Sequence, residues 1–162
     1  MNRIQGLYLV TDRDLCGGRP LKDVVLQAVK GGAACVQLRE KDPAVTTRRF
    51  VEEARAIKDL LTPLHVPLIV NDRLDVALAV GADGVHIGQQ DMPYGLARQI
   101  LGPKALIGLS VEGWADVEAA LALDVDYLGV SPVFDTLTKT DTKAAWGLQG
   151  LSRIRAATTL PL

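Results

Sequence analysis

The feature of this sequence that most constrains its fold is a repeated alternation of two patterns. Short apolar runs rich in β-branched residues are followed by longer stretches with apolar residues at helical spacing, and the pair recurs every ~20–30 residues, as βα units do. Such runs are typical of strands buried in a parallel sheet. They predict strands over Leu7–Thr11, Cys35–Leu38, Pro67–Val70, Gly84–Ile87, Ala105–Leu109 and Tyr127–Val130.

A helix is predicted after each of these strands. Several predicted helices end at glycine, as at Gly31, Gly81 and Gly102, because glycine readily adopts the left-handed conformation of a helix C-terminus. The predicted helices cover Leu21–Lys30, Thr46–Leu61, Leu74–Val80, Tyr94–Leu101, Ala115–Leu123 and Leu148–Ala157.

Length and charge narrow the class of protein. The 162 residues suit one domain with a real core, and a net charge of −1 gives no basic footprint for nucleic acid or an anionic membrane. No apolar run is long enough to span a bilayer, and no signal peptide precedes the first strand. Cys16 and Cys35 lack metal-site spacing, so we expect a cytoplasmic protein with reduced thiols. These features leave open whether the protein forms a homo-oligomer.

The stretch from Gln37 to Lys41 is unusual because a buried strand ends in polar and charged residues. At a period of two, Gln37, Arg39 and Lys41 share one face, so we expect three donors to converge on one point. That suits a ligand with several negative oxygens, whereas Glu40 should point to the outer layer. A solvated strand end is the simpler interpretation of this stretch alone.

Polar residues at the ends of the other strands favour a barrel. A doubly wound open sheet gathers its ligand groups at one switch point, whereas a (β/α)8 TIM barrel brings all its strand ends to one rim. Here candidate groups follow nearly every strand, at Asn71-Asp72, Asp91, Ser110 and Thr136–Lys139. The fold class predicted is α/β, a (β/α)8 barrel.

The predicted barrel is incomplete. We count six βα units, and Leu160-Pro161-Leu162 resembles the opening of a seventh strand, whereas such a domain usually needs at least ~200 residues. We therefore expect residues 1–162 to form a single TIM-barrel domain that lacks its last two βα units. Its first and sixth strands would then be open edges.

Taken in order, these motifs resemble those of the thiamine-phosphate synthase family, whose members join the pyrimidine and thiazole halves of thiamine. The resemblance covers the whole chain. It rests on the pentapeptide, on Asn71-Asp72, and on further motifs: Gly84-Val85-His86-Ile87-Gly88-Gln89 followed by Asp91, Gly108-Leu109-Ser110, and Pro132-Val133-Phe134 leading to Thr136-Leu137-Thr138-Lys139.

The resemblance implies a transferase of thiamine biosynthesis with two small-molecule substrates, an aminopyrimidine pyrophosphate and a thiazole phosphate. It implies that Asp72 and Asp91 bind Mg²⁺ and that Thr136, Leu137 and Thr138 meet the thiazole phosphate. It assigns Arg39, Lys41, Ser110 and Lys139 to catalysis, and the first substrate's pocket to Gln37, Leu38, Arg39, Glu40, Lys41, Asn71, Ser110 and Lys139. The family's phosphate-binding turns after strands seven and eight have no counterpart in this sequence.

The residue types suit that chemistry independently. Mg²⁺ prefers oxygen ligands and often takes one or two carboxylates plus substrate phosphate oxygens, and fixed cations favour the charge that grows on departing pyrophosphate. Simpler roles remain open: Asp72 and Asp91 could cap helices or close turns, Ser110 could bond backbone, and Lys139 could be solvated. His86, inside an apolar strand, is more typical of an interior histidine than of a catalyst.

Two other functions stay open. The first is a thiazole tautomerase-like relative on the same fold, which is less favoured because Val111-Glu112-Gly113 stands where that enzyme uses a histidine. The second is an inactive truncated fragment that binds the pyrimidine pyrophosphate weakly or not at all.

Overall fold

The residues that the structure describes form one six-stranded parallel sheet in sequential order. The computed structural model describes residues 4–135 and 144–162. Neighbours in the sheet are neighbours in sequence, from β1 to β6. The strands are β1 (Leu7–Val10), β2 (Ala33–Leu38), β3 (Leu68–Asn71), β4 (Gly84–Ile87), β5 (Leu106–Val111) and β6 (Tyr127–Val130).

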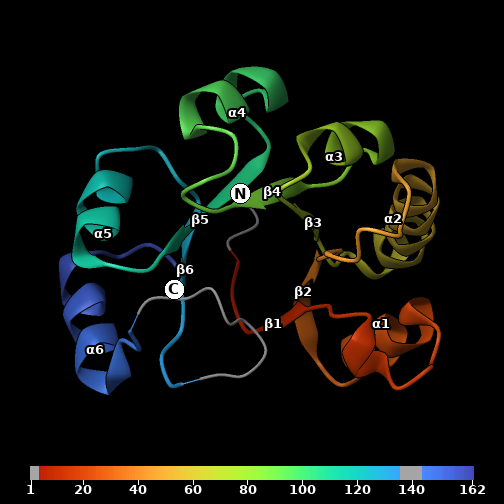
Figure 1. Cartoon of the computed structure of the whole chain (residues 1–162), viewed down its shortest axis with the longest axis horizontal. Helices are drawn as coiled ribbons and strands as arrows, with labels where there is room; N and C mark the ends of the chain where they lie inside the picture. The colour runs from red at the N-terminus through yellow and green to blue at the C-terminus, as the bar shows by residue number, and fades with distance from the viewer. Residues whose placement is uncertain (1–3, 136–143) are drawn as a thin grey trace.

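Each strand is followed by an α-helix, and the helices all lie outside the curved sheet (Figure 1). Because the strand order never reverses, every crossover winds in the same direction, which excludes a doubly wound sheet and confirms the partial barrel. The helices are α1 (Leu21–Lys30), α2 (Thr47–Leu61), α3 (Leu74–Val80), α4 (Tyr94–Leu101), α5 (Trp114–Leu121) and α6 (Gly147–Ala157).

The predicted elements are confirmed, with shifts of one or two residues at several ends. Thr46 is not the first residue of α2 but its N-cap, because its side-chain oxygen accepts a hydrogen bond from the Arg49 backbone N–H. Two short 3-10 helices, η1 (Asp14–Cys16) and η2 (Thr62–Leu64), were not predicted, since three residues are too few to display a period.

Alternation along the strands divides the protein into two layers. Residues such as Val36, Leu38 and Val70 point outward and are fully buried in the apolar core beneath the helices. Their neighbours in sequence point to the inside of the arc, where buried polar side chains such as Gln37 and His86 lie. The outer layer holds the fold together, and the inner layer is free to carry polar groups.

Two glycines make room for rings in the inner layer. A Cβ on Gly108 would lie 2.0 Å from Cζ of Tyr127, and a Cβ on Gly129 would lie 2.6 Å from Cε1 of His86. These spacings are far below any van der Waals contact, so only glycine allows the Tyr127 and His86 rings to cross the inside of the sheet.

The sixth strand also meets the segment that follows α6. The Leu128 backbone N–H donates a hydrogen bond of 3.0 Å to the Pro161 carbonyl, so this segment lies beside β6, where a seventh strand was expected to open. Within residues 4–135 and 144–162, no helix has the length and apolar character needed to cross a bilayer.

The packing of Gly108 can be tested by substitution. We expect Gly108→Ala to lower the free energy of unfolding by roughly 1–3 kcal/mol or more, because the added methyl collides with the Tyr127 ring. Gly95→Ala in α4 is the matched control: nothing lies within 4 Å of its added Cβ, so it should be neutral or stabilising by up to about 1 kcal/mol. Urea denaturation measures both, and equal effects would contradict this packing.

Candidate active site

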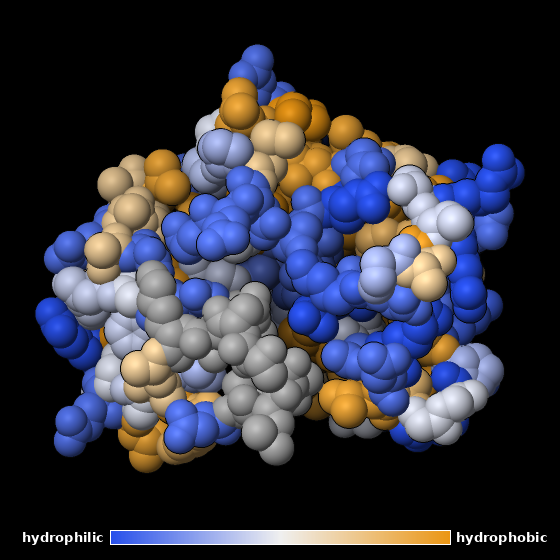
Figure 2. All heavy atoms as spheres, viewed as in Figure 1, coloured by the Kyte–Doolittle hydropathy of each residue, from blue (hydrophilic) through white to orange (hydrophobic). Residues whose placement is uncertain are grey.

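The candidate residues gather at the carboxyl ends of neighbouring strands, because parallel strands all end at the same edge of the sheet. The pentapeptide begins in β2 and continues past the end of that strand at Leu38. Asn71 ends β3 and Asp72 follows it, Asp91 follows β4, and Ser110 lies in β5. Figure 2 shows hydrophilic residues over the middle of the face seen in Figure 1. Thr136, Leu137, Thr138 and Lys139 lie outside the described residues.

The three donors of the pentapeptide do not converge on one point. The Gln37 side-chain amide donates to the Tyr8 hydroxyl (2.9 Å), Arg39 pairs with Asp12 (3.4 Å), and Lys41 Nζ donates to Asp72 Oδ2 (2.6 Å). The expectation assumed a period of two through residue 41, but β2 ends at Leu38 and the chain turns away there. The donors are therefore distributed between the barrel interior and its rim.

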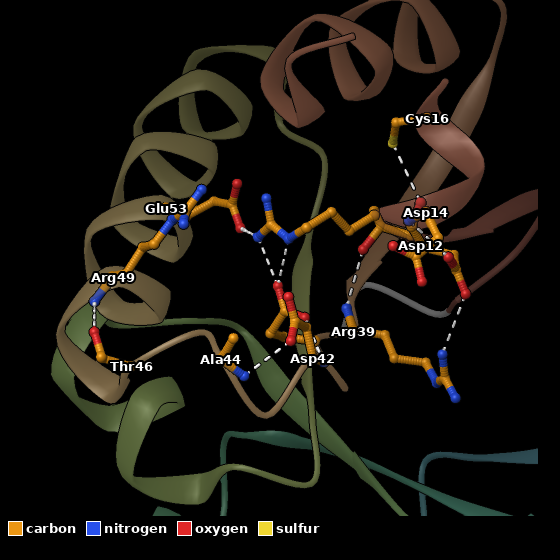
Figure 3. Close-up of polar contacts among 12 residues, drawn as sticks. Asp12, Asp14, Cys16, Arg39, Asp42, Ala44, Thr46, Arg49 and Glu53 are labelled. Carbon is orange, nitrogen blue, oxygen red and sulfur yellow. Dashed lines mark hydrogen bonds and ion pairs between the residues drawn. The ribbon is translucent and has the colours of Figure 1, made fainter. Parts of the chain in front are cut away.

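Two other members of the pentapeptide point away from the rim. Leu38 is fully buried in the outer apolar core. The Glu40 carboxylate accepts two hydrogen bonds from Arg13, at 2.6 and 2.8 Å, and Arg13 also pairs with Glu53 of α2 at 2.5 Å (Figure 3). The Glu40 side chain is only 7% exposed, and its partner Arg13 also binds Glu53 of the outer helix α2, so the expectation that Glu40 pairs on the outer layer is confirmed. Arg13, in the loop after β1, thus links the loop after β2 to α2 through two ion pairs.

A shallow cleft of about 250 Å³ lies between the ends of β1 and β2, lined by residues 12–14 and 39–43. The Thr11 hydroxyl oxygen accepts a hydrogen bond from the Arg39 backbone N–H (3.0 Å), and Asp12 holds the Arg39 side chain. Thr11 and Asp12 were not predicted as site residues. Their contacts with Arg39 join residues 28 and 27 positions apart, which local patterns do not report.

Asp72 and Asp91 follow neighbouring strands and lie near enough for the Asp91 carboxyl to act on the pKa of Asp72. Asp72 adopts φ +59°, and its backbone N–H donates to the His86 carbonyl (2.9 Å), which turns the chain at the end of β3. Asp91 Oδ2 accepts a hydrogen bond from the Gly88 N–H (2.7 Å). Asp91 thus closes a turn, whereas neither carboxylate caps the helix that follows it.

The electrostatics of this pair would favour a bound cation. Burial raises the pKa of Asp72, the neighbouring Asp91 carboxyl adds to the rise, and the Lys41 ammonium opposes it. The described residues contain no cluster of three or more His, Cys, Asp or Glu side chains that could hold a metal. Two carboxylates without a closed cage fit Mg²⁺, which keeps positions for water and phosphate oxygens.

Ser110 is linked to the barrel interior. Its hydroxyl lies 2.9 Å from Nε2 of His86, and Nδ1 of His86 lies 3.0 Å from the Tyr127 hydroxyl. Asn71 is in register with His86 on the neighbouring strand, so it shares the inward face. Tyr8 and Tyr127 were missed by the sequence interpretation. Polar aromatic residues in apolar strands, on the same alternation as Gln37 and His86, were the available signal.

The fold and the rim define a barrel enzyme of the (β/α)8 type whose strand ends carry cations beside a carboxylate pair. A family model described as "Thiamine monophosphate synthase" matches residues 7–162. The chain belongs to this family, whose members are transferases of thiamine biosynthesis.

Relatives agree over most of the chain. It is 59% identical to the thiamine-phosphate synthase of Albidiferax ferrireducens, covering 96% of this chain and 70% of that protein, and 52% identical to that of Leptospira biflexa, covering 99% and 78%. The solved thiamine phosphate pyrophosphorylase of Pyrococcus furiosus superposes with a TM-score of 0.84 at 37% identity, covering 96% of this chain and 71% of that one. These names favour the synthase over the tautomerase-like alternative.

The raised pKa of Asp72 predicts the sign of a pH effect on stability. In the folded state Asp72 keeps its proton to a higher pH than in the unfolded state. In metal-free buffer this residue therefore lowers the stability of the fold progressively as the pH rises above about 4, the ordinary pKa of an aspartate. Asp72→Asn should therefore lose less stability than the wild type between pH 4 and neutrality. Denaturant unfolding in EDTA at several pH values measures this difference.

Asp75 provides the matched control for this measurement. Arg73 lowers the pKa of Asp75, so that carboxylate stabilises the fold above its unfolded pKa and loses its effect as pH falls through the folded value. Asp75→Asn should change the slope weakly in the opposite sense. Parallel curves for the wild type and Asp72→Asn would contradict the assignment of Asp72.

Proposed function

We propose that this site condenses 4-amino-2-methyl-5-(diphosphooxymethyl)pyrimidine with 4-methyl-5-(2-phosphoethyl)thiazole to give thiamine phosphate and pyrophosphate. The observation that carries the proposal is the placement of Asp72 and Asp91 after neighbouring strands, with Lys41 bound to Asp72 and Arg39 at the same rim. A carboxylate pair flanked by cations suits a magnesium-bound pyrophosphate, which needs both a metal and direct positive partners.

The reaction needs charge stabilisation more than acid–base chemistry. The C–O bond to the pyrophosphate breaks, the leaving group takes the electron pair, and the aminopyrimidine delocalises the positive charge on its methylene carbon. The thiazole nitrogen then forms the C–N bond with its own lone pair. No proton is transferred and no side-chain nucleophile is required, which is consistent with a rim of cations, amides and hydroxyls.

Each described side chain has a separate task in this proposal. Arg39 presents a planar fork to phosphate oxygens, and Lys41 acts as a point charge beside them. Asp72 and Asp91 would hold Mg²⁺, which would supply positive charge to the departing pyrophosphate. Gln37, Asn71 and Ser110 would bind and orient the pyrimidine half from the inward face.

Further assignments rest on the family resemblance alone. Lys139 is proposed to contact the pyrophosphate, and Thr136, Leu137 and Thr138 to meet the thiazole phosphate. We also propose cytoplasmic residence, since Cys16 and Cys35 are both free thiols, the state that a reducing compartment maintains.

The carboxylate pair should be indispensable for turnover. We expect Asp72→Asn and Asp91→Asn each to lower the magnesium-dependent rate by at least ~10²-fold, the scale for losing a well-placed electrostatic group. Asp75→Asn, on the exposed start of α3, should retain the wild-type rate. Steady-state assays with both substrates and varied Mg²⁺ measure this. Undiminished turnover in both variants of the pair would exclude the proposed metal site.

Arg39 and Lys41 should bind the pyrophosphate group and not the pyrimidine ring. Arg39→Ala and Lys41→Ala should weaken binding of the pyrimidine pyrophosphate by at least ~10-fold, since each removes a charge-assisted hydrogen bond, and should leave binding of the unphosphorylated pyrimidine alcohol unchanged. Lys104→Ala, at an exposed turn after α4, is the control. Calorimetric titration with both ligands distinguishes these cases, and equal losses for both ligands would refute the assignment.

A further inference from the structure

A continuous chain of hydrogen bonds runs across the inside of the barrel and joins two candidate substrate-binding residues. It begins at the Gln37 amide, which donates to the Tyr8 hydroxyl (2.9 Å), and continues from Tyr8 to the Tyr127 hydroxyl (2.7 Å). His86 extends it, with Nδ1 3.0 Å from Tyr127 and Nε2 2.9 Å from the Ser110 hydroxyl. The five side chains come from β1, β2, β4, β5 and β6, that is, from all strands of the arc in Figure 1 except β3.

This chain of hydrogen bonds is largely buried, and the rings that take part in it are held in place by packing. Gln37, His86 and Tyr127 are buried, and the Tyr127 and His86 rings lie against Gly108 and Gly129, where any side chain would displace them. Burial raises the pKa of both Tyr8 and Tyr127 well above the ordinary value of a tyrosine. Both hydroxyls therefore keep their protons at neutral pH, and each has one hydrogen to donate.

The donors and acceptors allow one consistent direction along this chain. The Gln37 –NH₂ can only donate, so Tyr8 accepts from it. Within the described residues, the one acceptor that contacts the Tyr8 hydroxyl is the Tyr127 oxygen, so Tyr8 donates there. Tyr127 then accepts a hydrogen bond from Tyr8, and its own hydroxyl donates one to Nδ1 of His86.

The direction fixes the tautomer of His86. Because Nδ1 accepts from Tyr127, the proton of the neutral imidazole lies on Nε2, which donates to the Ser110 oxygen. Ser110 accepts from inside the barrel, and its own hydroxyl hydrogen is left to point elsewhere. In the opposite direction, the Ser110 hydroxyl would donate its hydrogen bond to His86, and the Tyr8 hydroxyl would have no acceptor among the described residues.

We propose that Tyr8, Tyr127 and His86 are positioning residues that hold the His86 proton on Nε2 and so keep the Ser110 hydroxyl as a hydrogen-bond donor toward the pyrimidine pyrophosphate. This inference rests on the proposed function for the identity of the ligand. The state of His86 does not depend on that function, because it is set by contacts within the chain. A change at Tyr8 or Tyr127 would reach the ligand through His86 and Ser110.

The tautomer can be read directly. Two-bond ¹H–¹⁵N correlation spectra of the labelled chain distinguish the two neutral imidazole tautomers from each other and from the imidazolium. The sequence holds two histidines, and the exposed His65, assigned with His65→Gln, serves as the internal reference. We expect His86 to be neutral with its proton on Nε2. A proton on Nδ1, or on both nitrogens, at neutral pH would overturn the proposal before any variant is made.

The three tyrosines provide a matched set of variants. Tyr127→Phe keeps the ring over Gly108 but removes the hydroxyl, so the His86 proton should redistribute between the two nitrogens. Tyr8→Phe should redistribute the His86 proton in the same way but to a smaller extent. This variant replaces Tyr127→Phe in the test if Tyr127→Phe does not fold. Tyr94→Phe removes a hydroxyl of α4 that bonds the Asp124 carbonyl, outside this chain of contacts, and should match the wild type. An unchanged His86 spectrum in well-folded Tyr127→Phe would also overturn the proposal.

A binding cycle tests whether the effect passes through Ser110. Calorimetric titration with the pyrimidine pyrophosphate in Mg²⁺ should show binding weakened about 10-fold by Tyr127→Phe, and no further weakening when Tyr127→Phe is added to Ser110→Ala. A full effect of Tyr127→Phe in the Ser110→Ala background would refute the positioning role. If the wild-type chain does not bind this ligand, the proposed function fails on that measurement, while the His86 spectrum still decides the tautomer.

Discussion

The alternation of side chains along six parallel strands is the constraint on which the rest of the structure depends. Every second residue points outward, where Val36, Leu38 and Val70 are sealed beneath the helices and supply most of the apolar burial. The inward-facing residues between them do not have to contribute to that apolar core. The inside of the barrel can therefore hold Gln37 and His86, polar groups that an apolar core would not tolerate without partners. Stability and chemistry are thus assigned to opposite faces of the same strands.

Polar groups on the inner face carry a cost unless all of them are bonded, and here the bonding extends to the rim. No buried side-chain nitrogen or oxygen within the described part of the chain lacks a partner. The interior hydrogen bonds end at Ser110, while the rim places Lys41 against Asp72 and Arg39 against Asp12. Charged groups at the rim remain partly solvated, so they can exchange these partners for a ligand without the penalty that a buried ion pair would impose.

The fold was predictable from sequence because it depends on local patterns, whereas the details of the site depend on distant contacts. Periodicity located every α-helix and strand among the described residues, and Glu40 was correctly expected to pair on the outer layer. The convergence of Gln37, Arg39 and Lys41 was not confirmed, because a period of two holds only within a strand and β2 ends at Leu38. Tyr8 and Tyr127 were missed because they meet across 119 residues of sequence, a contact that depends on the curvature of the whole sheet.

The central claim is that this rim is built to hold a magnesium-bound pyrophosphate. A crystal structure of the protein grown with Mg²⁺ and the pyrimidine pyrophosphate tests it most directly. The claim predicts a cation bound by Asp72 and Asp91, with Lys41 released from Asp72 and turned to a phosphate oxygen, and Arg39 released from Asp12. A structure with the ligand bound elsewhere, or with Lys41 still paired to Asp72 and no cation between the carboxylates, would contradict it.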